Sequence, residues 1–146
     1  MGEAPRGIPG FDELGNLPPG IHPATLEEVE RRFTWNPLRQ ELFAGLKKAL
    51  QQMALAGVER VWLGGSFISA SVAPRDIDGC WESGPRVNPV RLDPAICSGD
   101  GPAMRRRYGV HFVTDTPGPY MYVDFFQRDQ DGNPRGILLI EIGGMI

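Results

Sequence analysis

The chain has 146 residues, of which 41% are hydrophobic, and a formal net charge of −3. This length suits one domain around one core, and the slightly acidic balance argues against broad non-specific binding to nucleic acid. No run approaches the roughly 18 apolar residues of a membrane span, and the N-terminus lacks the apolar segment of a signal peptide. We therefore expect a single domain over residues 1–146, located in the cytoplasm and away from membranes.

The N-terminal third predicts an arm followed by two helices. Residues 1–23 are rich in proline and glycine and indicate an extended arm. The capping-box pattern Thr25-Leu26-Glu27-Glu28 predicts a short helix that ends at about Phe33. Asn36-Pro37 then begins a longer helix, because proline is favoured at the first helical position, and Gly57 is its natural end.

The rest of the chain predicts mainly strands, separated by loops. The patterns indicate five extended segments, at residues 58–63, 76–81, 108–113, 120–126 and 136–142. The Asp131-Gly132-Asn133-Pro134 turn predicts a hairpin between the last two. Residues 83–103 are rich in proline and glycine, with at most a helical turn at Asp93. The expected fold class is α+β, a mixed sheet with helices packed on one face.

A pair of aspartates follows a glycine–serine turn in the middle of the chain. Gly65 and Ser66 end the strand predicted at residues 58–63, and Asp76 and Asp78 come ten and twelve residues after the serine. Residues two apart on a strand share a face, so these carboxylates stand side by side. Like charges at this spacing usually hold a cation, and a few carboxylates together with substrate phosphates are typical of a Mg²⁺ site.

At these residues the chain resembles the DNA polymerase β-type nucleotidyltransferase superfamily. The signature of that superfamily is Gly-Ser, a gap of about ten residues and Asp-x-Asp. Within it, the chain is most similar to a group of small, mostly uncharacterised bacterial proteins. That similarity lies in Leu17-Pro18-Pro19-Gly20-Ile21-His22, in Gly65-Ser66-Phe67, and in Asp124-Phe125-Phe126-Gln127.

The resemblance implies a nucleotidyltransferase-like fold and a nucleoside triphosphate bound with Mg²⁺. Gly65, Ser66 and the single nearby cation Arg75 are then expected to contact the phosphates, while Asp76 and Asp78 hold metal and act in catalysis. Small members of the superfamily often modify a partner protein in toxin–antitoxin systems, so a protein hydroxyl is the acceptor that the resemblance suggests. In so short a chain, a partner protein or a homodimer would complete the site.

A third carboxylate normally completes the catalytic set, and the sequence offers no single residue for it. His111 is the residue expected to face the aspartate pair from the next strand, but it is not a carboxylate. Asp115 and Asp124 are the substitutes, and we favour Asp124 because it interrupts an apolar and aromatic run. For His111, a hydrogen-bonded or half-exposed side chain is preferred over a metal ligand. The alternative function is a binding module that retains the fold with a degenerate, non-catalytic site.

Overall fold

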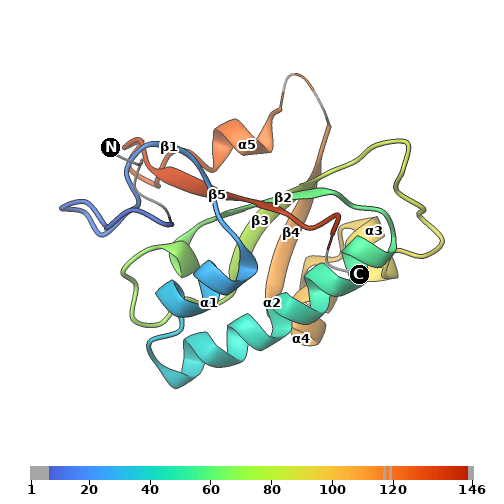
Figure 1. Ribbon diagram of the computed structural model, residues 1–146, viewed down its shortest axis with the longest axis horizontal. Helices are drawn as coiled ribbons and strands as arrows, with labels where there is room; N and C mark the ends of the chain where they lie inside the picture. Colours follow the sequence, from blue (N-terminus) through green and yellow to red (C-terminus); the bar gives the residue numbers. More distant parts are fainter. Residues whose placement is uncertain (1–6, 117, 119, 145–146) are drawn as a thin grey trace, which may run out of the picture.

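The computed structural model describes residues 7–116, 118 and 120–144. Its strands form one five-stranded sheet in the order β1-β5-β2-β3-β4, which confirms the α+β class with a mixed sheet (Figure 1). The pairs β1–β5 and β3–β4 are parallel, whereas β2 runs antiparallel to both β3 and β5. Among the helices in the described part of the chain, none has the length and apolar character needed to cross a bilayer.

The two predicted N-terminal helices form where the capping signals place them. Helix α1 spans Leu26–Phe33, and Thr25 and Glu28 make both hydrogen bonds of the capping box. Helix α2 spans Pro37–Leu55, where the Asn36 side chain accepts a hydrogen bond from the Arg39 backbone N–H. These local contacts satisfy donors that every helix start leaves unpaired, which is why the boundaries could be predicted.

Four of the five predicted strands are observed, and the arm contributes one more. The observed strands are β2 (Arg60–Gly64), β3 (Ile77–Glu82), β4 (Val110–Asp115), β5 (Gly136–Glu141) and β1 (Gly20–Pro23), which forms the sheet edge beside β5. Because β5 lies between β1 and β2, the hairpin predicted for the last two extended segments is wrong.

The strand predicted at residues 120–126 is also wrong, because Tyr122–Phe125 forms the one-turn helix α5. The cause is Asp115, whose carboxylate accepts hydrogen bonds from the backbone N–H groups of Met121, Tyr122 and Val123. These bonds fix the start of a helical turn and override the strand preference of an aromatic run. Three further helical segments are η1 (Ser66–Ile68), α3 (Pro94–Ser98) and α4 (Gly101–Tyr108).

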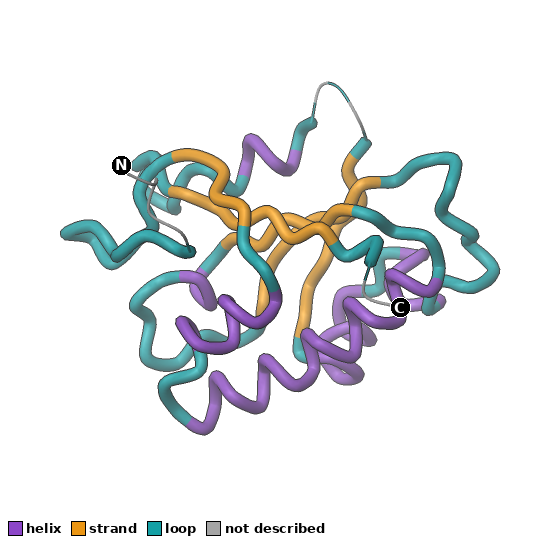
Figure 2. The backbone as a smooth tube through the Cα atoms, in the orientation of Figure 1, coloured by secondary structure: helices purple, strands orange, loops and turns teal. Residues whose placement is uncertain are grey.

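The sheet has one thickly covered face and one thinly covered face. Helices α1 to α4 pack on one side, as predicted, while among the helices of the described residues only the short α5 lies over the other (Figures 1 and 2). Alternate strand residues divide accordingly, so that Val61 and Leu63 join the main core, whereas Trp62 packs in a small cluster with Cys80 and Val123. Asp78 shares the face of Cys80, two residues away, and therefore lies on the thinly covered side.

A fully buried arginine ties helix α2 to the loop after β2. The Arg39 guanidinium donates hydrogen bonds to the carbonyl oxygens of residues 33, 66, 67, 69 and 71, at 2.6 to 3.3 Å. It also stacks 3.7 Å from the centre of the Trp35 ring. Burial lowers the pKa of Arg39 to about 10, so it is charged at neutral pH and supplies donors for a loop with few partners of its own.

A second ionic contact joins the segment before α3 to the end of α4. The Asp93 carboxylate accepts hydrogen bonds from Arg107 Nη1 and from the Tyr108 hydroxyl, each at 2.6 Å. Burial alone would raise the pKa of Asp93, but the bonds from Tyr108, Arg107 and the Ala95 N–H together lower it below its usual value. The contact therefore favours the ionised form of Asp93 in the folded state.

Replacing Arg39 by methionine should lower the free energy of unfolding by roughly 3 kcal/mol, because several buried carbonyl groups lose their donor. Arg39→Lys should cost less, since an ammonium still donates up to three of these bonds. Urea denaturation measures both. Arg31→Met is the matched control, because Arg31 is exposed beside Glu27 and should change stability by less than about 0.5 kcal/mol. Equal losses for Arg31→Met and Arg39→Met would contradict the assigned role.

Asp93→Asn should lower stability at neutral pH by about 1 kcal/mol, because it removes the charge and keeps a side chain that can cap α3. Since the pKa of Asp93 is lower in the folded state, its contribution is present above the unfolded value of about 3.9 and is lost as the pH falls through the folded value. Urea denaturation at neutral pH and near pH 2 should therefore show the two proteins converging in acid. Asp100→Asn, at the cap of α4, is the control.

Candidate functional site

Asp76, Asp78 and His111 converge at one end of the paired strands β3 and β4. Asp78 lies directly opposite His111 in the parallel register, and Asp76 immediately precedes β3. One ligand atom from each of the three side chains lies within 4.8 Å of the other two, and all three side chains are partly buried. The predicted pairing of the two aspartates and the predicted position of His111 are thus both observed.

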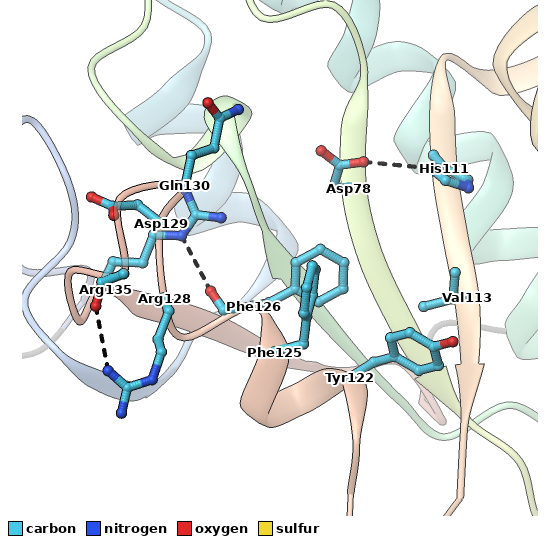
Figure 3. Close-up of a pocket in the computed structure, with 11 residues that line it drawn as sticks. Asp78, His111, Val113, Tyr122, Phe125, Phe126, Arg128, Asp129, Gln130 and Arg135 are labelled. Atoms are coloured by element: carbon cyan, nitrogen blue, oxygen red, sulfur yellow. Dashed lines mark hydrogen bonds and ion pairs between the residues drawn. The ribbon is translucent and has the colours of Figure 1, made fainter.

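Charges around the aspartates partly balance one another. Arg105 Nε donates to Asp76 Oδ2 at 2.9 Å, and Arg105 Nη2 lies 3.2 Å from His111 Nδ1. The same histidine nitrogen is 3.7 Å from Asp78 Oδ1 (Figure 3). Burial, and then the charge of Asp76, raise the pKa of Asp78, while His111 and two arginines oppose that rise. The pair is therefore an electrostatically costly arrangement that a bound cation would relieve.

The glycine–serine turn lies against this pair. Gly65 has φ +78°, and a Cβ atom built on it would be only 2.7 Å from Asp78 Oδ2. A side chain at this position would thus meet both backbone strain and a carboxylate. The next residues form η1, whose Ser66 and Phe67 carbonyl groups point to Arg39. Because a trans peptide places C=O and N–H on opposite sides, the N–H groups of Phe67 and Ile68 point away from Arg39.

A cavity of about 710 Å³ adjoins the pair on the thinly covered face of the sheet. Asp78 and His111 lie at one end of it, and aromatic side chains from α5 and its C-terminal end line another part (Figure 3). Arg128 and Arg135 face it from the loop that leads to β5. A volume of this size, with apolar walls and a few charged groups, is typical of a small-molecule site.

The structure separates the two substitute carboxylates from the aspartate pair. Asp124 lies exposed on α5, beside a different hollow next to Arg128 and Pro134, and it is outside the group formed by Asp76, Asp78 and His111. The oxygens of Asp115 are occupied by the α5 backbone. His111 is instead the third member of that group, and its partly exposed side chain lies 3.2 Å from Arg105 Nη2. These contacts agree with the interpretation preferred from the sequence, a hydrogen-bonded or half-exposed histidine instead of a metal ligand.

Two cations besides Arg75, whose contact with phosphates stays a prediction, lie near the site. Arg75 is exposed and makes no ion pair with any described residue, whereas Arg105 contacts Asp76 and Arg135 lines the cavity. Arg105 belongs to a run of three arginines at the end of α4, which on sequence alone indicates a solvated helix end. Helix α4 ends just before β4, and β4 pairs in parallel with β3. This pairing places Arg105 beside Asp76.

We compared the chain with protein-family models, with curated proteins and with solved structures. Neither the curated proteins nor the solved structures include a match. Residues 9–141 match one family model, which is described as a family of unknown function (DUF6932). Because that match covers most of the 146 residues, the chain belongs to the DUF6932 family.

Proposed function

We propose that this protein binds a nucleoside triphosphate together with a divalent cation and transfers the nucleotidyl group to an acceptor hydroxyl. The observation that carries the proposal is the convergence of Asp76, Asp78 and His111 beside the Gly65 turn. Carboxylates at this spacing suit a metal that also binds phosphate oxygens, and the turn approaches closely enough for its backbone to contact the same phosphates.

In this proposal, different residues of the chain would bind the cation and the phosphates. Asp76, Asp78 and His111 would hold the cation, which supplies charge neutralisation for the phosphates when bound. The N–H groups at the start of η1 and the Arg135 side chain would orient the triphosphate. The acceptor oxygen would then bond to the α-phosphorus as the bond to the bridging oxygen breaks, so that pyrophosphate leaves and the hydroxyl proton passes to solvent. The resemblance of the chain to small nucleotidyltransferases suggests that the acceptor hydroxyl belongs to a protein. That protein would be a partner or a second copy of the chain.

His111 supports a second candidate, a module that binds the nucleotide without transferring it. The usual third carboxylate also helps to activate the attacking hydroxyl, and an imidazole contributes no negative charge to that step. Measuring pyrophosphate release by protein that binds the nucleotide separates the two candidates. The assay includes cell extract as a source of acceptors. Pyrophosphate release faster than that of an Asp78→Asn variant favours nucleotidyl transfer. Nucleotide binding without pyrophosphate release favours the non-catalytic binding module.

Nucleoside triphosphates should raise the melting temperature only when Mg²⁺ or Mn²⁺ is present. At about 100 times its dissociation constant, a ligand adds roughly 2.7 kcal/mol of stability. Asp78→Asn should abolish this increase, because it removes a charged ligand from the metal. Glu41→Gln, an exposed change on the opposite helical layer, should retain it. A protein that no triphosphate stabilises in the presence of either metal would contradict the proposal.

Wild-type protein should bind Mn²⁺ more tightly than Mg²⁺, because an imidazole ligand suits transition-metal ions better than Mg²⁺. His111→Asp supplies a third carboxylate and should narrow that difference by tenfold or so, equivalent to about 1.4 kcal/mol. Titrating each metal alone against the melting temperature measures the preference without nucleotide. His22→Asn is the control, because His22 contacts the Pro18 carbonyl and not the aspartates, and it should leave the preference for Mn²⁺ unaltered. If His111→Asp retains the wild-type preference, His111 is not a ligand.

A further inference from the structure

One wall of the cavity beside Asp78 is aromatic. Tyr122, Phe125 and Phe126 line it, and the last two rings meet edge to face with centroids 5.4 Å apart. Phe126 packs into the small cluster under α5, but Phe125 has 67% of its surface exposed. Exposing a large ring inside a concave site costs solvation free energy, which a flat aromatic ligand would recover by stacking.

The opposite wall is polar and held in a defined shape. Asp129 accepts hydrogen bonds from the backbone N–H groups of Asp131 and Asn133 and from the Asn133 side chain, at 2.9 to 3.2 Å. Arg135 donates from Nε to the Phe126 carbonyl at 3.2 Å, which joins this loop to the aromatic wall (Figure 3). These bonds hold the backbone of the loop, and the exposed side chains of Arg128 and Gln130 also line the cavity.

The aromatic wall is continuous with the aspartate pair. A Cβ atom built on Gly64 would lie 2.9 Å from the Phe126 side chain, and one on the adjacent Gly65 would lie 2.7 Å from Asp78. Gly64 therefore lies close to the aromatic wall, and the next residue, Gly65, lies close to the Asp78 carboxylate. A ligand with an anionic end at Asp78 and the turn would reach the aromatic rings with its other end.

We propose that Phe125 and Tyr122 form a nucleobase subsite, on which the base of the bound nucleoside triphosphate stacks. This inference rests on the proposed function, which places the phosphates at the Gly65 turn. A nucleoside triphosphate matches the charges of the cavity, because its phosphates lie toward Arg135 and the cation while its uncharged flat base lies on the rings. Gln130, which carries both a donor and an acceptor, also lines the cavity.

The test compares nucleotides with inorganic tripolyphosphate, which has the same anionic end and no base. Calorimetric titration in Mn²⁺ should give dissociation constants at least tenfold lower for ATP and GTP than for tripolyphosphate. Phe125→Ala should weaken nucleotide binding by roughly 5- to 150-fold, the usual range for losing one stacked ring, and leave tripolyphosphate binding unchanged. Phe125→Tyr, which keeps a ring, should restore nucleotide affinity.

Met121→Ala is the matched control, because Met121 is also exposed beside α5 but does not line the cavity. Its affinities should equal those of the wild type. Equal affinities of wild-type protein for ATP and tripolyphosphate, unaltered by Phe125→Ala, would overturn the subsite and leave the proposed function standing. If neither ligand binds in the presence of metal, the proposed function fails and the subsite fails with it. Melting temperatures without ligand verify that each variant is folded.

Discussion

The buried guanidinium of Arg39 is the constraint on which the site depends. Removing a cation from water is costly, and here that cost is offset by hydrogen bonds to carbonyl oxygens and by the nearby rings of Trp35 and Phe67. Most of those carbonyl groups belong to residues 66–71, which follow β2 without long secondary structure of their own. Because helix α2 is rigid and well capped, it gives this loop a fixed position. The Gly65 turn thereby keeps one geometry against Asp78.

The unequal covering of the sheet places the site. Four helices bury one face in the main core, and this face supplies most of the hydrophobic stabilisation. The other face needs only a small cluster around Trp62 and Cys80, so α5 and the loop after it leave a cavity instead of a second core. Asp78 and His111 point to that side because they alternate with the core residues Ile77 and Phe112. The alternation of strand residues that buries Ile77 and Phe112 in the core therefore also directs Asp78 and His111 to the cavity.

The sequence predicted elements whose signals are local, and missed those that depend on distant contacts. The capping box at Thr25 and the Asn36-Pro37 start act within one helical turn, so α1 and α2 were predictable. Helix α5 was not, because its cap is Asp115, on the preceding strand. The same limit applies to the site. Asp76 and Asp78 are close in sequence, whereas Arg105 contacts Asp76 across a sequence separation of 29 residues and Arg39 contacts Ser66 across a separation of 27.

Arg105 also explains how the aspartate pair is tolerated without a bound cation. Its guanidinium neutralises Asp76, while burial and the remaining repulsion raise the pKa of Asp78. A cation bound as proposed would compete with Arg105 for Asp76. The Arg105 side chain is 46% exposed, but that of Asp76 is only 15% exposed, so direct bonds to the cation would have to offset the loss of a partly buried ion pair. Arg105 thus stabilises the aspartate pair on its own, and it is the group with which the proposed cation would compete.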